Sequence, residues 1–495
     1  MKKHTIACLG LILALVSGCH PGAKNEEVTP SAPPIIEATD DAPLADLIEE
    51  PIDPSNNLDT SLVSPDIVLP EEESDEEQTP TEQSENDATA SDATSKDLDA
   101  EAPEEVLTSS RQSLSPGIVF LDAYDEIVAL PDGFAVAGRY VAKLDEQGNE
   151  IWKDDLIGGN DLAFTSDIIV LSNGDIVACE PNSVKRYSDS GEVLFSKRIE
   201  GLKAAAPADD GGFVLCGGSH VPETIDSSLS PKGFNDIFVL KFTESNEVEW
   251  AKAFGSFGED IPFSVQKAPG GYVLAGSFGG NNGDFSDFSF YGDYADAFIM
   301  TLDNSGNLTN FNSYGSIGQD TPYSVTDTGN GFLSVGYSSA ETIEIHGVSK
   351  VATGIRTGVI VKFDYDCNPE WFELVGWQGI AELKDAVVYN GNAFILGETD
   401  DFSSNALSIE NVPKKAKSVE AFVISCSLAT GELNGFSSYT GTNADFAPGM
   451  CLYGDSVVIV GRTVSGSLAI RGNQTNNSGH HGFLAIEPVS SILFK

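Results

Sequence analysis

A pattern of short apolar runs recurs along residues 117–495, and it constrains the fold more than any other feature of the chain. One unit contains Gly271–Ser277 (GYVLAGS), then Asp296–Asp303 (DAFIMTLD) after a loop, then Tyr314–Ser316 (YGS). The unit before it contains Gly212–Gly218 (GFVLCGG) and Asp236–Phe242 (DIFVLKF). Such self-similarity is the sequence signature of a repeat architecture, in which each unit buries its apolar surface against its neighbours.

The period comes from one position in the fourth run of each unit. That position is occupied in turn by Trp152, Phe195, Trp250, Asn310, Trp371 and Gly435, and a seventh unit follows near the C-terminus. Each unit supplies four short strands, which in the fourth unit are Pro262–Lys267, Tyr272–Ser277, Ala297–Leu302 and Leu308–Tyr314. Four-stranded units at this spacing are typical of propeller blades. We therefore predict an all-β domain over residues 113–495, a seven-bladed β-propeller of four-stranded blades in which the aromatic residues of the series pack between blades.

A closed propeller must pair its first and last blades, since unpaired sheet edges invite association. The C-terminal segment Ser491–Lys495 is expected to be the outer strand of blade seven. Ile118–Leu121, at the start of the domain, is the competing candidate for that position. Both alternatives predict that the two ends of the domain lie close together.

The repeat resembles a known family. The run Gly270–Ser277, followed by Asp296–Asn307 and Tyr314–Ser316, is similar to the SBBP-type β-propeller repeats of bacterial surface and secreted proteins. The similarity covers nearly all of residues 117–495 and is clearest in units three to five. It implies a propeller fold and a location outside the cytoplasm, but almost nothing about activity.

A fainter similarity concerns the turns. Leu144–Trp152 and Leu428–Leu433 are similar to repeats of quinoprotein dehydrogenases and of outer-membrane assembly lipoproteins. The shared feature is a glycine turn before a strand, which is structural and implies no quinone chemistry.

The N-terminus has the pattern of a lipoprotein signal peptide. Lys2 and Lys3 precede an apolar run from Ile6 to Val16, which is too short to span a bilayer. It ends in Val16-Ser17-Gly18-Cys19, which resembles the bacterial lipobox. The prediction is a signal peptide at 1–18 and lipidation of Cys19 with a diacylglycerol and an acyl chain such as palmitate, which would anchor the protein to a bacterial membrane. An ordinary signal peptide with a chance cysteine is the alternative.

Residues 19–112 are expected to form a disordered acidic linker. They are rich in Pro, Glu, Asp, Ser and Thr and almost free of aromatic residues, so they cannot bury enough apolar surface to offset the entropy of ordering. The linker would hold the domain away from the membrane; binding of cations or basic partners is the alternative role. The whole chain has a formal charge of −49, which repels phosphate groups and excludes a nucleic-acid partner.

Insertions are predicted on one face of the disc. They fall between the second and third strands of blades three to seven, whereas blades one and two have only Arg139-Tyr140 and Pro181-Asn182 there. Long loops confined to one face favour a binding surface, which would form an open crescent; neutral drift in loop length is the alternative. We expect such loops to bury little core. All four histidines of the domain, His220, His346, His480 and His481, lie in these insertions and are expected to be ordinary surface residues.

Acidic residues on the same face are weak candidates for Ca²⁺ binding, since Ca²⁺ prefers oxygen ligands. The candidates are Asp260, Asp320, Asp284 and Asp293, and Asp161, Asp296 and Asp445 lie in comparable places. No calcium-loop spacing is present, and Asp at such turns commonly accepts hydrogen bonds from backbone N–H groups. The five scattered cysteines of the domain have no ligand-like spacing and are expected to be buried in strands.

No motif for nucleophilic, metal-dependent or nucleotide chemistry is present. We therefore expect a surface-exposed, lipid-anchored, non-catalytic binding or scaffold protein that holds a protein or a glycan on the loop-rich face. The alternative is a propeller enzyme, such as a carbohydrate-active hydrolase or lyase, with acidic residues near the central channel. A deep polar pocket with two facing carboxylates would favour the enzyme.

Overall fold

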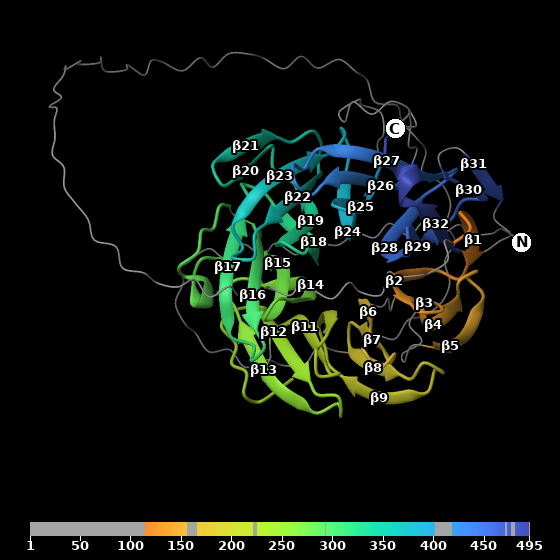
Figure 1. Cartoon of the computed structure of the whole chain (residues 1–495). Helices are drawn as coiled ribbons and strands as arrows, with labels where there is room; N and C mark the ends of the chain where they lie inside the picture. The colour runs from red at the N-terminus through yellow and green to blue at the C-terminus, as the bar shows by residue number, and fades with distance from the viewer. Residues whose placement is uncertain are drawn as a thin grey trace, which may run out of the picture. The chain divides into compact units, whose positions relative to one another are not determined.

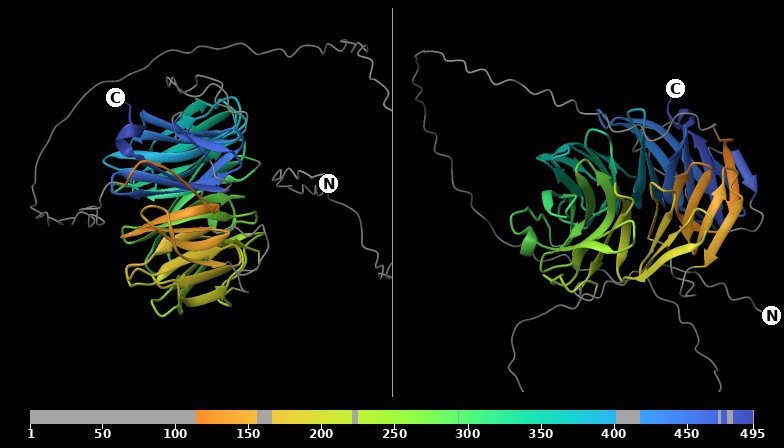
Figure 2. Two further views of the ribbon diagram at one scale, coloured as in Figure 1. Left: turned by 90° about the vertical axis from the view of Figure 1, so that its right-hand side faces the viewer. Right: turned by 60° about the horizontal axis from the view of Figure 1, so that its bottom comes forward.

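The computed structural model describes residues 114–155, 166–220, 225–292, 294–400, 418–470, 473–476 and 481–494. They form seven four-stranded antiparallel sheets arranged as a ring around a central channel (Figure 1). Figure 2 shows the same ring from the side and tilted forward. The prediction of a seven-bladed β-propeller is confirmed. No helix among the described residues has the length and apolar character needed to cross a bilayer. The predicted signal peptide, Cys19 and the linker lie outside the described residues.

The first four blades follow the chain in order. Blade one contains β2 (Tyr124–Leu130), β3 (Gly133–Gly138), β4 (Tyr140–Asp145) and β5 (Glu150–Asp155). Blade two contains β6 (Asp167–Val170), β7 (Ile176–Glu180), β8 (Ser183–Tyr187) and β9 (Val193–Arg198). Blade three contains β10 (Leu202–Pro207), β11 (Phe213–Ser219), β12 (Asp236–Phe242) and β13 (Val248–Phe254). Blade four contains β14 (Ile261–Ala268), β15 (Gly271–Phe278), β16 (Asp296–Asp303) and β17 (Leu308–Tyr314), close to the strands predicted.

The last three blades carry extra hairpins or close the ring. Blade five contains β18 (Asp320–Asp327), β19 (Phe332–Ser338), β22 (Thr357–Phe363) and β23 (Pro369–Val375), with the hairpin β20 (Thr342–Ile345) and β21 (Val348–Val351) between β19 and β22. Blade six contains β24 (Ala381–Tyr389), β25 (Asn392–Thr399), β26 (Glu420–Ser427) and β27 (Leu433–Gly441). Blade seven contains β28 (Asp445–Tyr453), β29 (Ser456–Thr463), β32 (Gly482–Pro488) and β1 (Gly117–Leu121); β30 (Ser467–Ile470) and β31 (Asn473–Asn476) lie between β29 and β32 and extend the sheet of blade six.

The middle strands of each blade are buried on both faces, which explains why they read as continuous apolar runs. Every residue of β15 is buried, as is every residue of β12. One apolar cluster joins Val214 and Val239 of blade three to Leu274 and Met300 of blade four. The core is therefore a set of layers between neighbouring blades, as the apolar pattern on both strand faces requires.

The series of aromatic positions is confirmed by strand register. Trp152, Trp250 and Trp371 each stand opposite a lysine in the third strand, and Phe195, Asn310 and Gly435 occupy the same place in blades two, four and six. Each indole N–H donates to a backbone carbonyl in the next blade, at Asp189 (2.9 Å), Asn304 (3.0 Å) and Leu428 (3.0 Å). These tryptophans therefore pack between blades, as predicted.

The ring is closed by the segment at the start of the domain, the second of the two candidates for the outer strand of blade seven. β1 pairs antiparallel with β32 in a continuous register from Gly117–Ile486 to Leu121–Gly482. The expectation that Ser491–Lys495 is the outer strand is wrong, because β1 already occupies the free edge of β32. Residues Val489–Ile492 instead form the short helix α1, whose Ile492 is buried in the cluster shared by blades six and seven. The two ends of the domain lie close together, as both alternatives required.

The insertions lie between the second and third strands of blades three to seven, as predicted. The expectation that they bury little core is wrong for blades four and five. Phe285 is fully buried and packs on Phe278 (centroids 5.6 Å apart) and Phe311 (4.8 Å). Ile343 and Ile345 of β20 are buried against the cluster shared by blades four and five. Apolar residues within these insertions join the layers between neighbouring blades, so the two segments extend the core.

Candidate binding face and channel mouth

The insertions share one face of the ring with the connectors that pass from blade to blade. Register places the start of each first strand beside the end of the second strand, as in Ile261–Ser277, Asp320–Ser338 and Asp445–Thr463. Each insertion begins where the second strand ends. We call this side the loop-rich face.

Large apolar side chains are exposed at repeated positions on the loop-rich face. Phe234, Tyr294 and Ile355 each precede the third strand of their blade by two residues, and they are 71%, 67% and 69% exposed. A second position lies three residues before Asp260 and Asp320 and exposes Phe257 and Ile317. We call these five residues, together with Tyr291, the apolar crescent; they belong to blades three, four and five and to the connectors that follow blades three and four.

Backbone pairing holds the crescent in place. Phe234 donates its N–H to Gly258 (3.1 Å), and the adjacent Asn235 forms a parallel bridge with Glu259. Ile355 likewise donates its N–H to Gly379 (2.9 Å). The segment that enters each third strand is thus paired with the connector of the next blade. Because the backbone beneath the exposed side chains is ordered, displaying them requires little further loss of entropy.

Buried carboxylates brace these connectors. Asp260 accepts hydrogen bonds from the backbone N–H groups of Ser256 (2.6 Å) and Gly279 (3.0 Å), and Asp320 accepts from Ser316 (3.0 Å). Burial raises the pKa of each carboxyl to about 6. Burial also raises the pKa of Asp296 to about 7, helped by the nearby Asp320. One oxygen of Asp296 has no hydrogen-bond partner among the described residues.

The predicted calcium candidates are therefore engaged by protein donors. Asp284 accepts from the backbone N–H of Gly255 (3.1 Å) and pairs with Lys232 (3.4 Å), close to Asp260. Asp320 lies at the next blade junction, while Asp293 and Asp161 fall outside the described residues. Within the described ranges, no three Asp, Glu, His or Cys residues gather in a geometry that would hold a metal ion. His220, His346 and His481 are exposed, and the five cysteines of the domain are buried.

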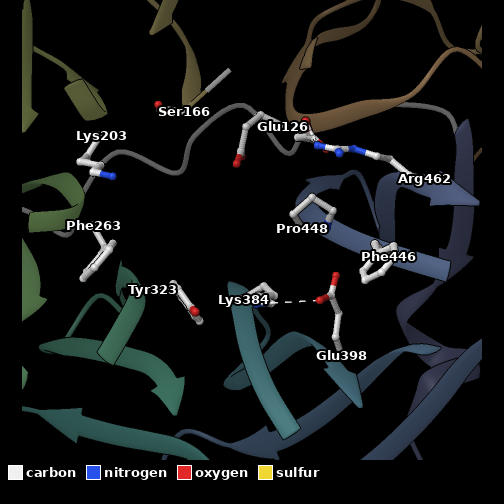
Figure 3. A pocket seen from close by; sticks show the side chains of 11 residues that line it. Glu126, Ser166, Lys203, Phe263, Tyr323, Lys384, Glu398, Phe446, Pro448 and Arg462 are labelled. Atoms are coloured by element: carbon white, nitrogen blue, oxygen red, sulfur yellow. Dashed lines mark hydrogen bonds and ion pairs between the residues drawn. The ribbon is translucent and has the colours of Figure 1, made fainter. Parts of the chain in front are cut away.

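A cavity of about 440 Å³ lies at the mouth of the central channel, on the loop-rich face (Figure 3). All seven blades contribute to its wall. Lys203, Phe263, Tyr323 and Lys384 each occupy the β-bulge of a first strand, where the register shifts by one residue. A bulge redirects a side chain out of the regular alternation, and the first strands of blades one and seven carry such a register shift too, so six bulges surround one cavity. The other walls are Asp125, Glu126, Ser166, Glu398, Phe446, Pro448 and Arg462.

Ion pairs fix most of the charged groups at the mouth. The Arg462 guanidinium donates to Asp125 with Nε 2.7 Å from Oδ1. Lys384 bonds Glu382 and lies 3.8 Å from Glu398, which also accepts the backbone N–H of Ala447 (3.0 Å). Burial of Glu398 raises the pKa of its carboxyl.

Two charged side chains at the mouth, those of Lys203 and Glu126, have no ion-pair partner among the described residues. Lys203 has no carboxylate partner among the described residues, and its Nζ lies 6.0 Å from the centre of the Phe263 ring. The side chain of Glu126 points into the cavity (Figure 3), and no described residue donates a hydrogen bond to it. Burial raises the pKa of Glu126 well above its ordinary value, and the nearby Asp167 and Asp385 raise it further.

Beneath the mouth, acidic residues link the first strands of neighbouring blades. Asp167 accepts the backbone N–H of Ala205 (2.8 Å), and Asp385 accepts that of Met450 (3.2 Å). Burial raises the pKa of Asp167 to about 7 and that of Asp385 to about 6. The channel continues below them as a cavity of about 550 Å³, whose first-strand walls bring polar side chains such as Gln266 and Lys267 beside apolar ones.

Comparisons with known proteins give similarity to solved structures but no family match. No protein-family model and no curated protein matches the chain. In structure it is similar to BamB from Moraxella catarrhalis, with 9% identity and a TM-score of 0.42 over 76% of this chain and 99% of that one. It is also similar to a virginiamycin B lyase from Staphylococcus aureus (9% identity, TM-score 0.39, 75% and 99%). A protein of unknown function from Bacteroides caccae shares 13% identity, with a TM-score of 0.34 over 64% of this chain and 93% of that one. Similarities this distant say nothing about function, which has to be argued from the geometry.

Sequence reasoning found the loop-rich face but missed the apolar crescent and the channel mouth. The crescent was detectable as a large apolar residue two positions before the third strand of blades three, four and five. The channel mouth was not detectable, because its residues, such as Lys203 and Lys384, are single charged positions within apolar strands. Their common location depends on bulges that no spacing in the sequence reveals.

Proposed function

We propose that this protein is a lipid-anchored binding protein that holds a protein partner on its loop-rich face through the apolar crescent. The observation that carries the proposal is the recurrence of exposed Phe, Tyr and Ile side chains at equivalent positions of consecutive blades. Exposed apolar side chains that gather on one face are typical of interaction surfaces, and aromatic residues are enriched at their centres.

Charge defines the partner further. The chain carries a formal charge of −49, and the part outside the signal peptide and linker is itself strongly acidic. A partner with an apolar patch surrounded by basic residues would match this surface and associate faster at low salt.

The envelope location and the anchor rest on the lipobox-like sequence at Cys19. Cys19→Ala is expected to release the protein from membrane fractions, and unchanged partitioning would contradict the anchor.

The test of partner binding uses a matched pair of triple variants. Phe234→Ser, Tyr294→Ser and Ile355→Ser together remove the crescent, while Ile151→Ser, Val193→Ser and Leu194→Ser remove exposed apolar residues from the outer strands of blades one and two. Quantitative cross-linking of the mature chain to envelope proteins should capture a partner with wild type and with the control, at least tenfold more than with the crescent variant. Equal capture by both variants would exclude the crescent.

A propeller enzyme is the second candidate, favoured by the carboxyl groups of Glu126 and Glu398 at the cavity (Figure 3). Burial raises the pKa of the Glu126 carboxyl, which is the direction that general acid catalysis needs, and a second carboxylate could act as base or nucleophile. Turnover of a glycan by the purified protein, lost in Glu126→Gln, would establish this function.

A further inference from the structure

We propose that the channel mouth is a separate binding site for an acidic sugar, a pyranose that carries a carboxylate. The inference is independent of the apolar crescent and requires no catalysis. It rests on three properties of the cavity: its size, its unmatched cation and its mixture of aromatic and hydrogen-bonding walls.

The size fits a small ligand. A volume of about 440 Å³ lies within the range of small-molecule sites, which run from about 300 to 1,000 Å³. The walls come from the first strands of six blades, from Ser166 just before the first strand of blade two, and from two second strands. These strands belong to the buried core of the ring, so the site is already formed before a ligand arrives.

The charge balance points to an anionic group on the ligand. Asp125 and Glu398 lie within ion-pair distance of Arg462 and Lys384, whereas Lys203 has no carboxylate partner among the described residues. This is notable in a chain with 76 acidic and 27 basic residues, in which a lysine is easily matched. A ligand carboxylate at Lys203 would supply the missing anion through a charge-assisted hydrogen bond.

The other walls fit a sugar ring. Phe263 and Tyr323 meet edge to face with centroids 6.0 Å apart, and Phe446 is 39% exposed. A pyranose has C–H bonds on its faces, which pack on aromatic rings, and hydroxyl groups at its rim. Glu126 can bond such hydroxyls, because the oxygens of a carboxyl group accept hydrogen bonds from hydroxyl donors. A ligand carboxylate near Lys203 and hydroxyls near Glu126 would thus use both side chains that have no ion-pair or hydrogen-bond partner among the described residues.

The experiment measures binding of D-galacturonic acid and its dimer to the mature chain by titration calorimetry, with D-galactose and sodium acetate as comparison ligands. The dimer is expected to bind at least tenfold more tightly than D-galactose or acetate. Lys203→Met should weaken the acidic ligands at least tenfold, while Lys203→Arg should retain most of the affinity. Lys267→Met, at the lower channel, is the matched control and should bind like wild type.

Each other outcome overturns the proposal. Equal binding of D-galactose would remove the role of the carboxylate, and equal binding of acetate would remove the role of the sugar ring. No binding of either acidic ligand, or unchanged binding by a folded Lys203→Met variant, would exclude the site. Thermal melting of each variant shows whether it is folded. Loss of partner capture in the crescent variant does not bear on these results, so the two proposals fail separately.

Discussion

Blades one and two and blades three to five share one framework and differ on the loop-rich face. In both regions a tryptophan packs on a turn glycine of the next blade, Trp152 on Gly191 and Trp250 on Gly306. The second and third strands of blade one are separated only by Arg139, whereas 17 residues separate those of blade four. In blades one and two, the large apolar residues that are more than a third exposed lie on the outer strands, at Ile151, Val193 and Leu194.

The difference shows that separate sets of residues encode the fold and the exposed surface that we propose for binding. Strand packing needs the same residues in every blade, so both regions keep them. The crescent can vary without disturbing the ring because its side chains are exposed at one end of the strands, whereas the insertions of blades four and five also add buried residues to the core. The following predictions test how far this separation holds.

The largest effect tests whether the blade-four insertion is independent of the core. Phe285→Ala should lower the free energy of unfolding by about 3–5 kcal/mol, because the ring is fully buried among Phe278, Phe298 and Phe311. Tyr291→Ala, in the same insertion but 48% exposed, should stay within about 0.5 kcal/mol of wild type in chemical denaturation. A small effect of Phe285→Ala would mean that the insertion is dispensable for folding.

The second prediction concerns the carboxylates that brace the junctions of blades three to five. Their pKa values are raised in the folded protein, so folding favours the protonated form. The contribution of Asp296 to the stability of the fold is fully present below the pKa of its carboxyl in the unfolded chain, near 3.8. This contribution is lost as the pH rises toward the pKa of about 7 that the carboxyl has in the folded protein. Asp296→Asn should reduce the loss of stability between pH 5 and pH 7 by about 2 kcal/mol. Thermal denaturation across this range measures it, and a wild type that gains stability toward pH 7 would contradict it.

The smallest effect tests the shared framework. Gly191 and Gly306 have φ values of +86° and +76°, and an added Cβ would lie 2.7 Å from the facing tryptophan. Alanine at either position should destabilise the protein equally, by about 1 kcal/mol more than Gly270→Ala, since Gly270 has φ +79° but open space around it. Unequal losses in denaturant unfolding would show that the two regions do not share this contact.

The sequence was sufficient to predict the features that recur in every blade. It was insufficient to predict the features that arise when the two ends of the domain close the ring. The strands of blade four and the series from Trp152 to Gly435 were predicted correctly, because packing imposes the same residues at each turn of the ring. The outer strand of blade seven was assigned wrongly, since both chain ends are short apolar segments and only pairing with β32 distinguishes them. The insertions were expected to be exposed because their polar residues outnumber buried ones such as Phe285. The channel mouth depends on bulges in strands far apart in sequence, so no local pattern predicts it.

The pairing of β1 with β32 has a consequence for the order of folding. Gly117 meets Ile486, a partner made 369 residues later, so the first strand of the domain to be synthesised is the last to find its place. Until then GIVFL is an apolar strand with both edges free, a segment of the kind that associates with other chains. Contacts between residues so distant in the chain form slowly. A nascent chain of this protein therefore passes through a long interval in which six blades can assemble while the seventh lacks its outer strand, and protection of residues 117–121 during that interval would govern its yield.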